Sequence, residues 1–261
     1  MRPLIQLRPH QQRALDALAK YLKGQVIMPT ASGKTNVAIF DALREFEKDT
    51  PQTIVVVAPR IMLANQLSSE FLEHIENVAV LHVHSGETHH NITTKPFEIQ
   101  WWDSMVSGAF NPDAPKHKLI FTTYNSLQRI VESDIRVDTI YFDEAHNSVQ
   151  RHFFPATEHF ASAADRCYFF TATPKHSATV SKPGMNDAAV YGNVICNVPA
   201  PELVDGGFIV PPKVVVQQFE MLGKGQIVAD VDAENLIQTI DRKSTRLNSS
   251  HVSESRMPSS A

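Results

Sequence analysis

Residues 28–35 have the composition of a loop that binds phosphate. They read Met-Pro-Thr-Ala-Ser-Gly-Lys-Thr and lie between a short apolar segment and a stretch with helical periodicity. A loop in that position directs backbone N–H groups and the N-terminus of the following helix at a phosphate. Lys34 is then placed to reach the β- and γ-phosphates of a nucleotide, and the Thr35 hydroxyl to bind magnesium. We predict a nucleotide site made by Pro29, Thr30, Ala31, Ser32, Gly33, Lys34 and Thr35.

An acidic pair further along the chain has the chemistry that such a site needs. Asp143 and Glu144 follow the apolar residues 139–142, and the sequence continues with Ala145 and His146. A metal-bound nucleotide requires one carboxylate to hold the metal and another to polarise the attacking water. Asp143, at the end of a predicted strand, suits the first role, and Glu144 suits the second. The alternative, an acidic pair that caps a helix, is disfavoured by the phosphate-binding loop upstream.

The elements that must position these motifs alternate between strands and helices. Apolar runs predict strands at residues 25–28, 53–58, 78–83, 119–122, 139–142 and 167–170. Apolar residues at helical spacing predict helices at 10–22, from the loop to about residue 46, at 61–75 and around 99–106. Continuous β-branched runs such as 53–58 are typical of buried parallel strands. We therefore predict an α/β fold, with a mostly parallel sheet and helices on both faces.

Composition limits the class of protein. The 261 residues carry a formal net charge of −4, are 43% hydrophobic and include only two cysteines. No apolar run approaches the roughly 18 residues that span a membrane, and two cysteines are too few for a disulfide framework. We expect a globular cytoplasmic protein with no membrane partner. The acidic balance excludes a basic coat over the whole surface, but it permits one positive groove that binds nucleic acid.

The order of the motifs resembles that of the superfamily 2 DEAD/DEAH-type helicases, in the branch of type III restriction-enzyme helicase subunits and phage DNA helicases. Besides the two motifs above, similar segments lie at 7–11, 57–60, 122–127, 171–174 and 202–212. Met28 departs from the motif, which usually has glycine there, although this branch often lacks that glycine. The resemblance implies a RecA-like P-loop NTPase domain that binds ATP and magnesium, with magnesium held by Thr35 and Asp143.

The resemblance also assigns roles to single residues. It implies that Lys34, Asp143, Glu144 and His146 are catalytic and that Gln11 reads the edge of adenine. Thr171 and Thr173, in the sequence Thr-Ala-Thr-Pro, are implied to couple hydrolysis to domain movement.

Four further residues are predicted to hold the backbone of a nucleic acid. Pro59 and Arg60 follow one predicted strand, and Thr123 and Ser126 follow another at the start of a helix. Free N–H groups and hydroxyls at such positions can hold phosphate. Ordinary helix capping is the alternative for each residue. Backbone contacts carry no base code, which suits a motor that steps along any sequence, and the resemblance favours DNA over RNA.

The sequence predicts four segments. Residues 1–197 are the first RecA-like ATP-binding domain, 198–212 a connector and 213–240 the truncated start of a second RecA-like domain. Residues 241–261 are Ser-rich, and their back-translation resembles a short-read sequencing adapter. We expect this tail to be a disordered artefact, with the missing second domain belonging to the same parent chain. The present chain alone is then expected to hydrolyse ATP slowly and to unwind nothing.

These observations predict an ATP-dependent DNA helicase or translocase. Three alternatives stay open: the motor subunit of a restriction–modification complex, an RNA helicase, and a nucleotide-gated nucleic-acid-binding module that does not translocate. His82, His84, His89 and His90 suggest a metal site, but histidines in a strand and a polar loop with no cysteine nearby are interpreted as unliganded.

Overall fold

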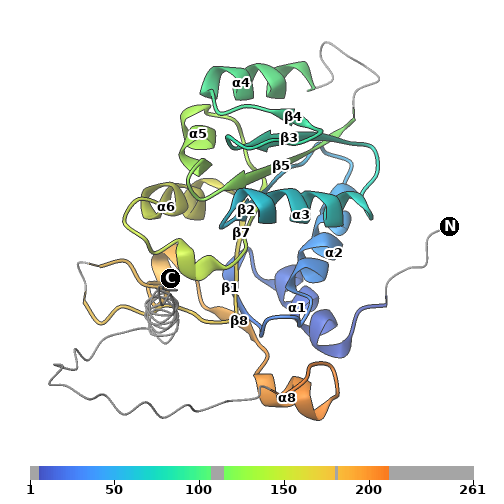
Figure 1. The fold of residues 1–261 in the computed structure, drawn as a ribbon, viewed down its shortest axis with the longest axis vertical. Coiled ribbons are helices and arrows are strands. Elements are labelled where there is room, and N and C mark those ends of the chain that lie inside the picture. Colours follow the sequence, from blue (N-terminus) through green and yellow to red (C-terminus); the bar gives the residue numbers. More distant parts are fainter. Residues whose placement is uncertain (1–5, 107–114, 180–181, 212–261) are drawn as a thin grey trace, which may run out of the picture. The chain divides into compact units, whose positions relative to one another are not determined.

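The computed structural model describes residues 6–106, 115–179 and 182–211, and within these ranges it contains one eight-stranded sheet (Figure 1). Every strand pairs in parallel with its neighbours, in the order β4-β3-β5-β2-β6-β7-β1-β8. The strands are β1 (Lys23–Ile27), β2 (Thr53–Ala58), β3 (Val78–Val83), β4 (Asn91–Ile92), β5 (His117–Thr123), β6 (Thr139–Phe142), β7 (Arg166–Thr171) and β8 (Val194–Asn197). The prediction of an α/β fold with a parallel sheet is confirmed.

Helices cover both faces of this sheet. They are α1 (Pro9–Lys20), α2 (Lys34–Phe46), α3 (Ile61–Leu72), α4 (Pro96–Met105), α5 (Leu127–Glu132), α6 (Phe154–Ala163), α7 (Ala188–Tyr191) and α8 (Ala200–Asp205), with a 3₁₀ turn, η1, at Ala145–Asn147. The strand β2 is buried on both sides, with Ile54 and Val56 in one core cluster and Val55 and Val57 in the other. The two clusters lie on opposite faces of the sheet, because successive side chains of a strand point to opposite faces. Helices α1, α2 and α3 contribute to the first cluster, and α4, α5, α6 and α7 contribute to the second.

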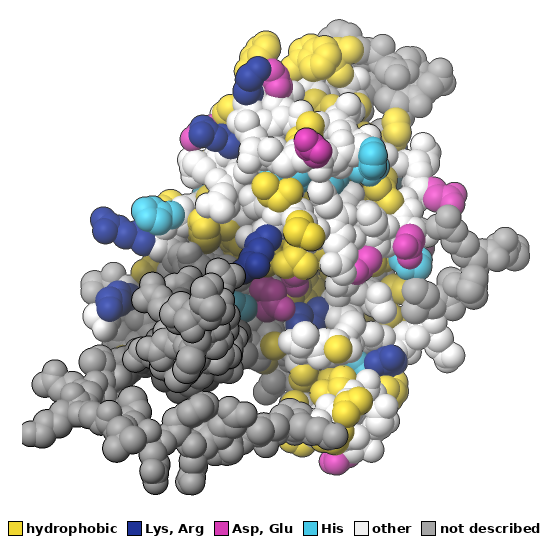
Figure 2. Space-filling view, viewed as in Figure 1, with side chains coloured by type: hydrophobic (Ala, Val, Ile, Leu, Met, Phe, Trp, Pro, Cys, Tyr) yellow, Lys and Arg dark blue, Asp and Glu magenta, His cyan; other side chains and the backbone are white. Residues whose placement is uncertain are grey.

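One helix leaves part of its apolar surface exposed. On α4, Ile99 and Trp102 are buried in the core, whereas Phe97 and Trp101 are 74% and 59% exposed. Figure 2 shows hydrophobic side chains gathered over this helix. None of the helices in the described ranges combines the length and the hydropathy of a membrane span.

The predicted segments are described only in part. The connector predicted at 198–212 is described as far as residue 211 and belongs to the same compact unit as the sheet. Its helix α8 packs on α1, where Arg13 Nη2 lies 2.9 Å from Glu202 Oε1. The predicted segments 213–240 and 241–261 lie outside the described residues. The domain boundaries therefore stay predictions.

A buried group of charges joins α2 to the start of β7. Arg166 lies 3.0 Å from an oxygen of Asp41 and 2.7 Å from an oxygen of Glu45, and all three side chains are buried. Tyr141 of β6 donates a hydrogen bond of 2.7 Å to the other oxygen of Asp41. Removing one partner of a buried ion pair leaves the other charge without a partner in an interior that solvates it poorly. Loss of any one member of this group should therefore destabilise the fold.

Replacing Arg166 by alanine should therefore destabilise the protein. We expect Arg166→Ala to lower the free energy of unfolding by about 3 kcal/mol, because two buried carboxylates lose their shared guanidinium. The low end of the usual range applies because Arg44 and Lys48 also pair with these carboxylates. Urea unfolding measures the change. The control Arg129→Ala removes an exposed pair with Glu132 and should cost less than about 1 kcal/mol. Equal losses in the two variants would contradict the prediction.

Candidate functional site

The loop between β1 and α2 turns sharply because two of its residues adopt left-handed backbone angles. Ala31 has φ 62° and Gly33 has φ 83°. The N–H and the hydroxyl of Ser32 both donate to the carbonyl of Pro29, at 3.3 and 2.6 Å. Helix α2 then begins at Lys34, with no side-chain cap and no acidic residue in its first turn. Because the first N–H groups of a helix have no partner within it, this N-terminus suits an anion such as phosphate.

The Gln11 side chain of α1 holds this loop from inside the protein. Its Nε2 donates to the carbonyls of Ser32, at 3.1 Å, and Gly33, at 3.5 Å, and its Oε1 accepts from the N–H of Arg8 at 2.8 Å. A Cβ atom on Gly33 would lie 2.1 Å from that Nε2, so the position requires glycine. His10 contributes a further contact, with its Nε2 3.0 Å from the carbonyl of Ser32. The adenine contact expected of Gln11 stays a prediction.

Met28 occupies the position at which the motif usually has glycine, and its role here is that of a strand residue. It is fully buried in the core, and its N–H donates to the carbonyl of Thr171 at 3.0 Å, continuing the pairing of β1 with β7. The turn starts only after it. A side chain at this position therefore does not obstruct the loop.

Lys34 and the acidic pair lie together at the end of the sheet. The Nζ of Lys34 is 3.7 Å from Glu144 Oε1. The same amine lies 3.4 and 3.5 Å from the carbonyls of Met28 and Pro29, which are long distances for hydrogen bonds. The contacts of this amine within the described part of the chain are thus all 3.4 Å or longer. The structure places these motifs in one site.

Asp143 has the environment of a cation ligand. Burial, together with the negative charge of Glu144, raises the pKa of Asp143 to about 6, while the positive charge of Lys34 opposes the shift. A cation beside this carboxylate would favour its charged form. Oxygen ligands such as the Asp143 carboxylate and the Thr35 hydroxyl are those that magnesium prefers. The residues present therefore fit a magnesium ion.

The predicted coupling residues form one chain of contacts that starts at the acidic pair. Glu144 Oε2 is 3.5 Å from His146 Nδ1, and this nitrogen is 3.1 Å from the hydroxyl of Thr171. The same hydroxyl accepts from the N–H of Thr173 at 3.1 Å. A change at Glu144 can thus reach the loop that follows β7 through direct contacts.

The predicted nucleic-acid residues follow two neighbouring strands. Ala58 and Thr123 are paired in the register of β2 and β5, so Pro59 and the turn at 123–126 leave the sheet side by side. Arg60 is exposed and Ser126 is half-buried. Thr123 is buried, and its hydroxyl donates to Ser126 Oγ at 3.4 Å. This contact is within the turn, and α5 has no side-chain cap at its N-cap residue Ser126. The contacts of all four residues with nucleic acid stay predictions.

One contact at this edge was missed by the sequence analysis. The hydroxyl of Tyr124 donates to the backbone carbonyl of Asp143 at 2.8 Å. No sequence pattern near either residue predicts this contact, because the two residues follow strands that are not adjacent in the sheet.

Residues 4–176 match the sequence model of one protein family, described as type III restriction enzyme, res subunit. The chain belongs to this family. Membership agrees with a RecA-like domain of the helicase-type NTPases. The match to the res subunit family contains every residue discussed above from Arg8 to Thr173. No curated protein sequence gives a significant match.

Solved structures with the same fold include two restriction enzymes and a helicase. A nuclease-deletion mutant of the Type ISP restriction-modification enzyme LlaGI, in complex with a DNA substrate mimic, has a TM-score of 0.66 at 23% identity over 78% of this chain. The ATP-dependent Type ISP enzyme LlaBIII, bound to DNA, has a TM-score of 0.64 at 21% identity over 77% of the chain. The Hef helicase domain of Pyrococcus furiosus has 0.54 at 20% identity over 74%. The matched part spans only 21%, 15% and 38% of those proteins, respectively.

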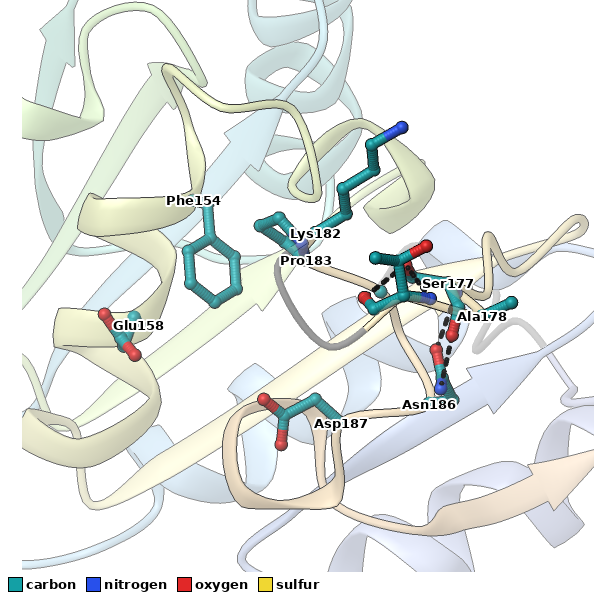
Figure 3. A pocket seen from close by; sticks show the side chains of 10 residues that line it. Phe154, Glu158, Ser177, Ala178, Lys182, Pro183, Asn186 and Asp187 are labelled. Atoms are coloured by element: carbon teal, nitrogen blue, oxygen red, sulfur yellow. Dashed lines mark hydrogen bonds between the residues drawn. The ribbon is translucent and has the colours of Figure 1, made fainter.

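A separate pocket of about 440 Å³ lies between α6 and the described residues that follow the res subunit match (Figure 3). Phe154 and Glu158 line it from α6, and residues 177–179, 182–184 and 186–187 line it from the other side. Asn186 pairs with the backbone of Ser177 through both of its amide atoms, at 2.8 and 3.0 Å. None of the residues that line this pocket belongs to the motifs above, so we do not assign it to the nucleotide site.

Three of the four histidines, His82, His84 and His90, pack together near α3, whereas His89 is exposed. His82 is fully buried; its Nδ1 lies 3.0 Å from His84 Nε2, and its Nε2 lies 3.0 Å from Ser68 Oγ. The ring of His90 stacks on it at 5.3 Å. Within the described part of the chain, no group of three or more potential ligands is arranged to hold a metal. Burial, with the charges of His84 and His90, lowers the pKa of His82 to about 4.

The buried His82 should make stability depend on pH. The unfolded chain takes up a proton near pH 6.5, whereas folded His82 resists it until about pH 4, so stability falls as pH drops through this window. We expect wild type to lose up to roughly 3 kcal/mol relative to His82→Gln between these pH values. Urea unfolding at several pH values measures the difference. The exposed control His89→Gln should give a curve parallel to wild type, and a parallel curve for His82→Gln would refute the prediction.

Proposed function

We propose that this domain is the ATP-binding half of a motor that couples ATP hydrolysis to movement along DNA. The approach of Lys34 Nζ to Glu144 Oε1, at 3.7 Å beside the phosphate-binding loop, carries the proposal. A phosphate in that loop would become the partner of Lys34. Glu144 would then be released to accept a proton from an attacking water.

The other residues of the site have roles that follow from their positions. The backbone of residues 29–33 and the start of α2 would bind the phosphates. Thr35 and Asp143 would hold magnesium, which neutralises charge on the phosphates when it is bound. His146, Thr171 and Thr173 would pass the state of the nucleotide to the loop after β7. Both polar atoms of the Gln11 amide already have hydrogen-bond partners in the protein, so Gln11 would have to form an additional contact, or exchange one of these, to bind adenine.

Nucleic acid would bind along the neighbouring ends of β2 and β5. Arg60 and Ser126 would contact phosphates there, with Pro59 and Thr123 shaping the two turns. The LlaGI and LlaBIII structures contain DNA, which supports DNA over RNA as the ligand of the parent protein. Contacts of this kind are independent of base sequence.

The res subunit match favours one specific form of the proposal, in which the parent protein is the motor of a restriction complex. Such a protein needs a nuclease as well as a motor. The sequence of the complete parent protein decides between this form and a free helicase, because a cluster of carboxylates with a lysine outside the motor domains would indicate a nuclease.

Lys34 and Glu144 should affect nucleotide binding and hydrolysis differently. We expect Lys34→Ala to weaken the binding of magnesium-ATP by at least about tenfold, because the phosphates lose their cation. Glu144→Gln should bind ATP but lower the residual rate of hydrolysis by about 10² or more. Calorimetry and phosphate release measure the two effects. The surface control Lys95→Ala, on an exposed pair with Glu98, should change neither. Wild-type ATP affinity in Lys34→Ala would overturn the proposal.

Gly33 should tolerate no side chain if the loop binds phosphate. In Gly33→Ala, the positive φ costs about 1–2 kcal/mol, and the new Cβ displaces Gln11 from the loop. We expect ATP affinity to fall by at least about tenfold. Gly207→Ala is the matched control, since φ is 68° there but nothing lies within 4 Å of a Cβ. If both variants bound ATP equally well, the loop would not be the binding site.

Glu144→Gln also separates a motor from a nucleotide-gated clamp. In a motor, blocked hydrolysis holds the nucleotide-bound state on the strand, so the variant should dissociate from single-stranded DNA more slowly with ATP than wild type does. A clamp that never uses hydrolysis should show equal dissociation rates. Stopped-flow fluorescence of labelled DNA, with and without ATP, gives the answer.

A further inference from the structure

Tyr124 connects two motifs that lie on different strands. It is the first residue after β5, and its side chain is 2% exposed. Its hydroxyl donates to the carbonyl of Asp143, which follows β6, at 2.8 Å. In the sheet, β2 lies between β5 and β6, so the tyrosine reaches across the end of β2. Its own N–H donates to Ala58, the last residue of β2, at 3.2 Å. One residue thus contacts the ends of all three strands.

The carbonyl that Tyr124 contacts belongs to the peptide between Asp143 and Glu144. Glu144 has φ 45° and ψ 54°, a left-handed conformation that costs a residue with a side chain about 1–2 kcal/mol. Such a conformation persists only where surrounding contacts hold it. Rotation of this peptide would redirect the Glu144 side chain relative to Lys34. The tyrosine hydroxyl therefore helps to set the direction of the second carboxylate.

On its other side, Tyr124 belongs to the turn predicted to bind nucleic acid. The N–H of Ser126 donates to the carbonyl of Thr123 at 2.9 Å, and this turn encloses Tyr124. The tyrosine ring packs at 6.1 Å from the ring of Phe142 and at 5.6 Å from that of Phe153. These ring contacts restrict independent rotation of the side chain, so we expect a shift of the turn backbone to move the hydroxyl with it.

The chemistry of the hydroxyl suits a permanent donor. Burial, reinforced by the charge of Asp143, raises the pKa of Tyr124 well above its ordinary value. The group therefore stays protonated at physiological pH. A backbone carbonyl accepts this bond whether the Asp143 carboxyl is charged or neutral.

We propose that Tyr124 is a positioning residue that couples nucleic-acid binding at the Thr123–Ser126 turn to the direction of the Asp143–Glu144 peptide. The inference rests on the proposed function, because it concerns how the two ligands of that motor influence each other. When the turn binds a strand, the hydroxyl shifts with it, and the peptide that carries Glu144 follows. Nucleotide binding influences the turn by the same route in reverse, since coupling between two binding sites is reciprocal.

Tyr124→Phe tests this link, since it removes one oxygen and keeps the ring. The experiment measures the affinity of the 261-residue chain for single-stranded DNA, by fluorescence anisotropy, with and without magnesium and a non-hydrolysable ATP analogue. We expect wild type to show a nucleotide-dependent change of about fivefold or more. In Tyr124→Phe the change should fall below about twofold, while each ligand alone binds with nearly wild-type affinity.

Tyr168→Phe is the matched control. This tyrosine is fully buried too, and its hydroxyl donates to the backbone carbonyls of Leu18 and Tyr21 at 2.9 and 2.6 Å. A general loss of packing would affect both variants, whereas loss of coupling should affect Tyr124→Phe alone. Thermal unfolding of both variants verifies that they fold.

The outcomes separate the inference from the proposed function. If Tyr124→Phe binds both ligands and keeps the wild-type coupling, the inference is wrong and the motor stands. The inference also fails if wild type binds both ligands without coupling or if Tyr168→Phe loses coupling equally. If wild type binds neither ATP nor DNA, the proposed function itself fails.

Discussion

The parallel direction of every described strand is the constraint on which the site depends. Because the carboxyl ends of parallel strands meet at one edge, the residues after β1, β2, β5, β6 and β7 are brought together although they are far apart in the chain. The 3.7 Å approach of Lys34 to Glu144 is one result of this arrangement. The contact of His146 with Thr171, at 3.1 Å, is another. In an antiparallel sheet, alternate strand ends would lie at the opposite edge, and these contacts could not form.

The two edges of the sheet differ in how closely their charged groups are paired. Near the amino edge, where β7 starts at Arg166, the guanidinium lies 3.0 Å from Asp41 and 2.7 Å from Glu45, and these ion pairs hold α2 against β7. At the carboxyl edge, Lys34 has only long contacts, and the pKa of the half-buried Asp143 carboxyl is raised to about 6. Well-paired buried charges stabilise the folded structure. Incompletely paired charges are stabilised when a ligand of opposite charge binds to them. The ion pairs of Asp41 and Glu45 thus hold α2 near the edge opposite to the one where its first turn lies.

The sequence predicted the central part of this fold better than its margins. The strands at 53–58, 78–83 and 139–142 have the observed bounds, because uninterrupted apolar runs mark buried strands. The edge strands β4 and β8 were missed, since they are short and largely exposed and have no such run. Helices α7 and α8 are too short to show a period. In the candidate site, the motifs predicted that Lys34 and Glu144 act on one nucleotide, and the structure brings their side chains to 3.7 Å of each other. Tyr124 was missed because its contact with Asp143 depends on strand order, which spacing along the chain does not reveal.

The acidic net charge of the chain is compatible with binding to DNA because of where the described charges lie. Several acidic side chains are already paired within the protein, as Glu202 is with Arg13 and Glu132 with Arg129, so their fields are partly cancelled close to the surface. Screening by salt limits the remaining long-range repulsion to about 10 Å at 0.1 M ionic strength. In the proposed function, binding would then depend on groups close to the strand, such as the exposed Arg60 and the half-buried Ser126. For the proposed motor this would be an advantage, because a strand held by few ionic contacts can be released and bound again at each step, whereas a strongly basic surface would hold it continuously.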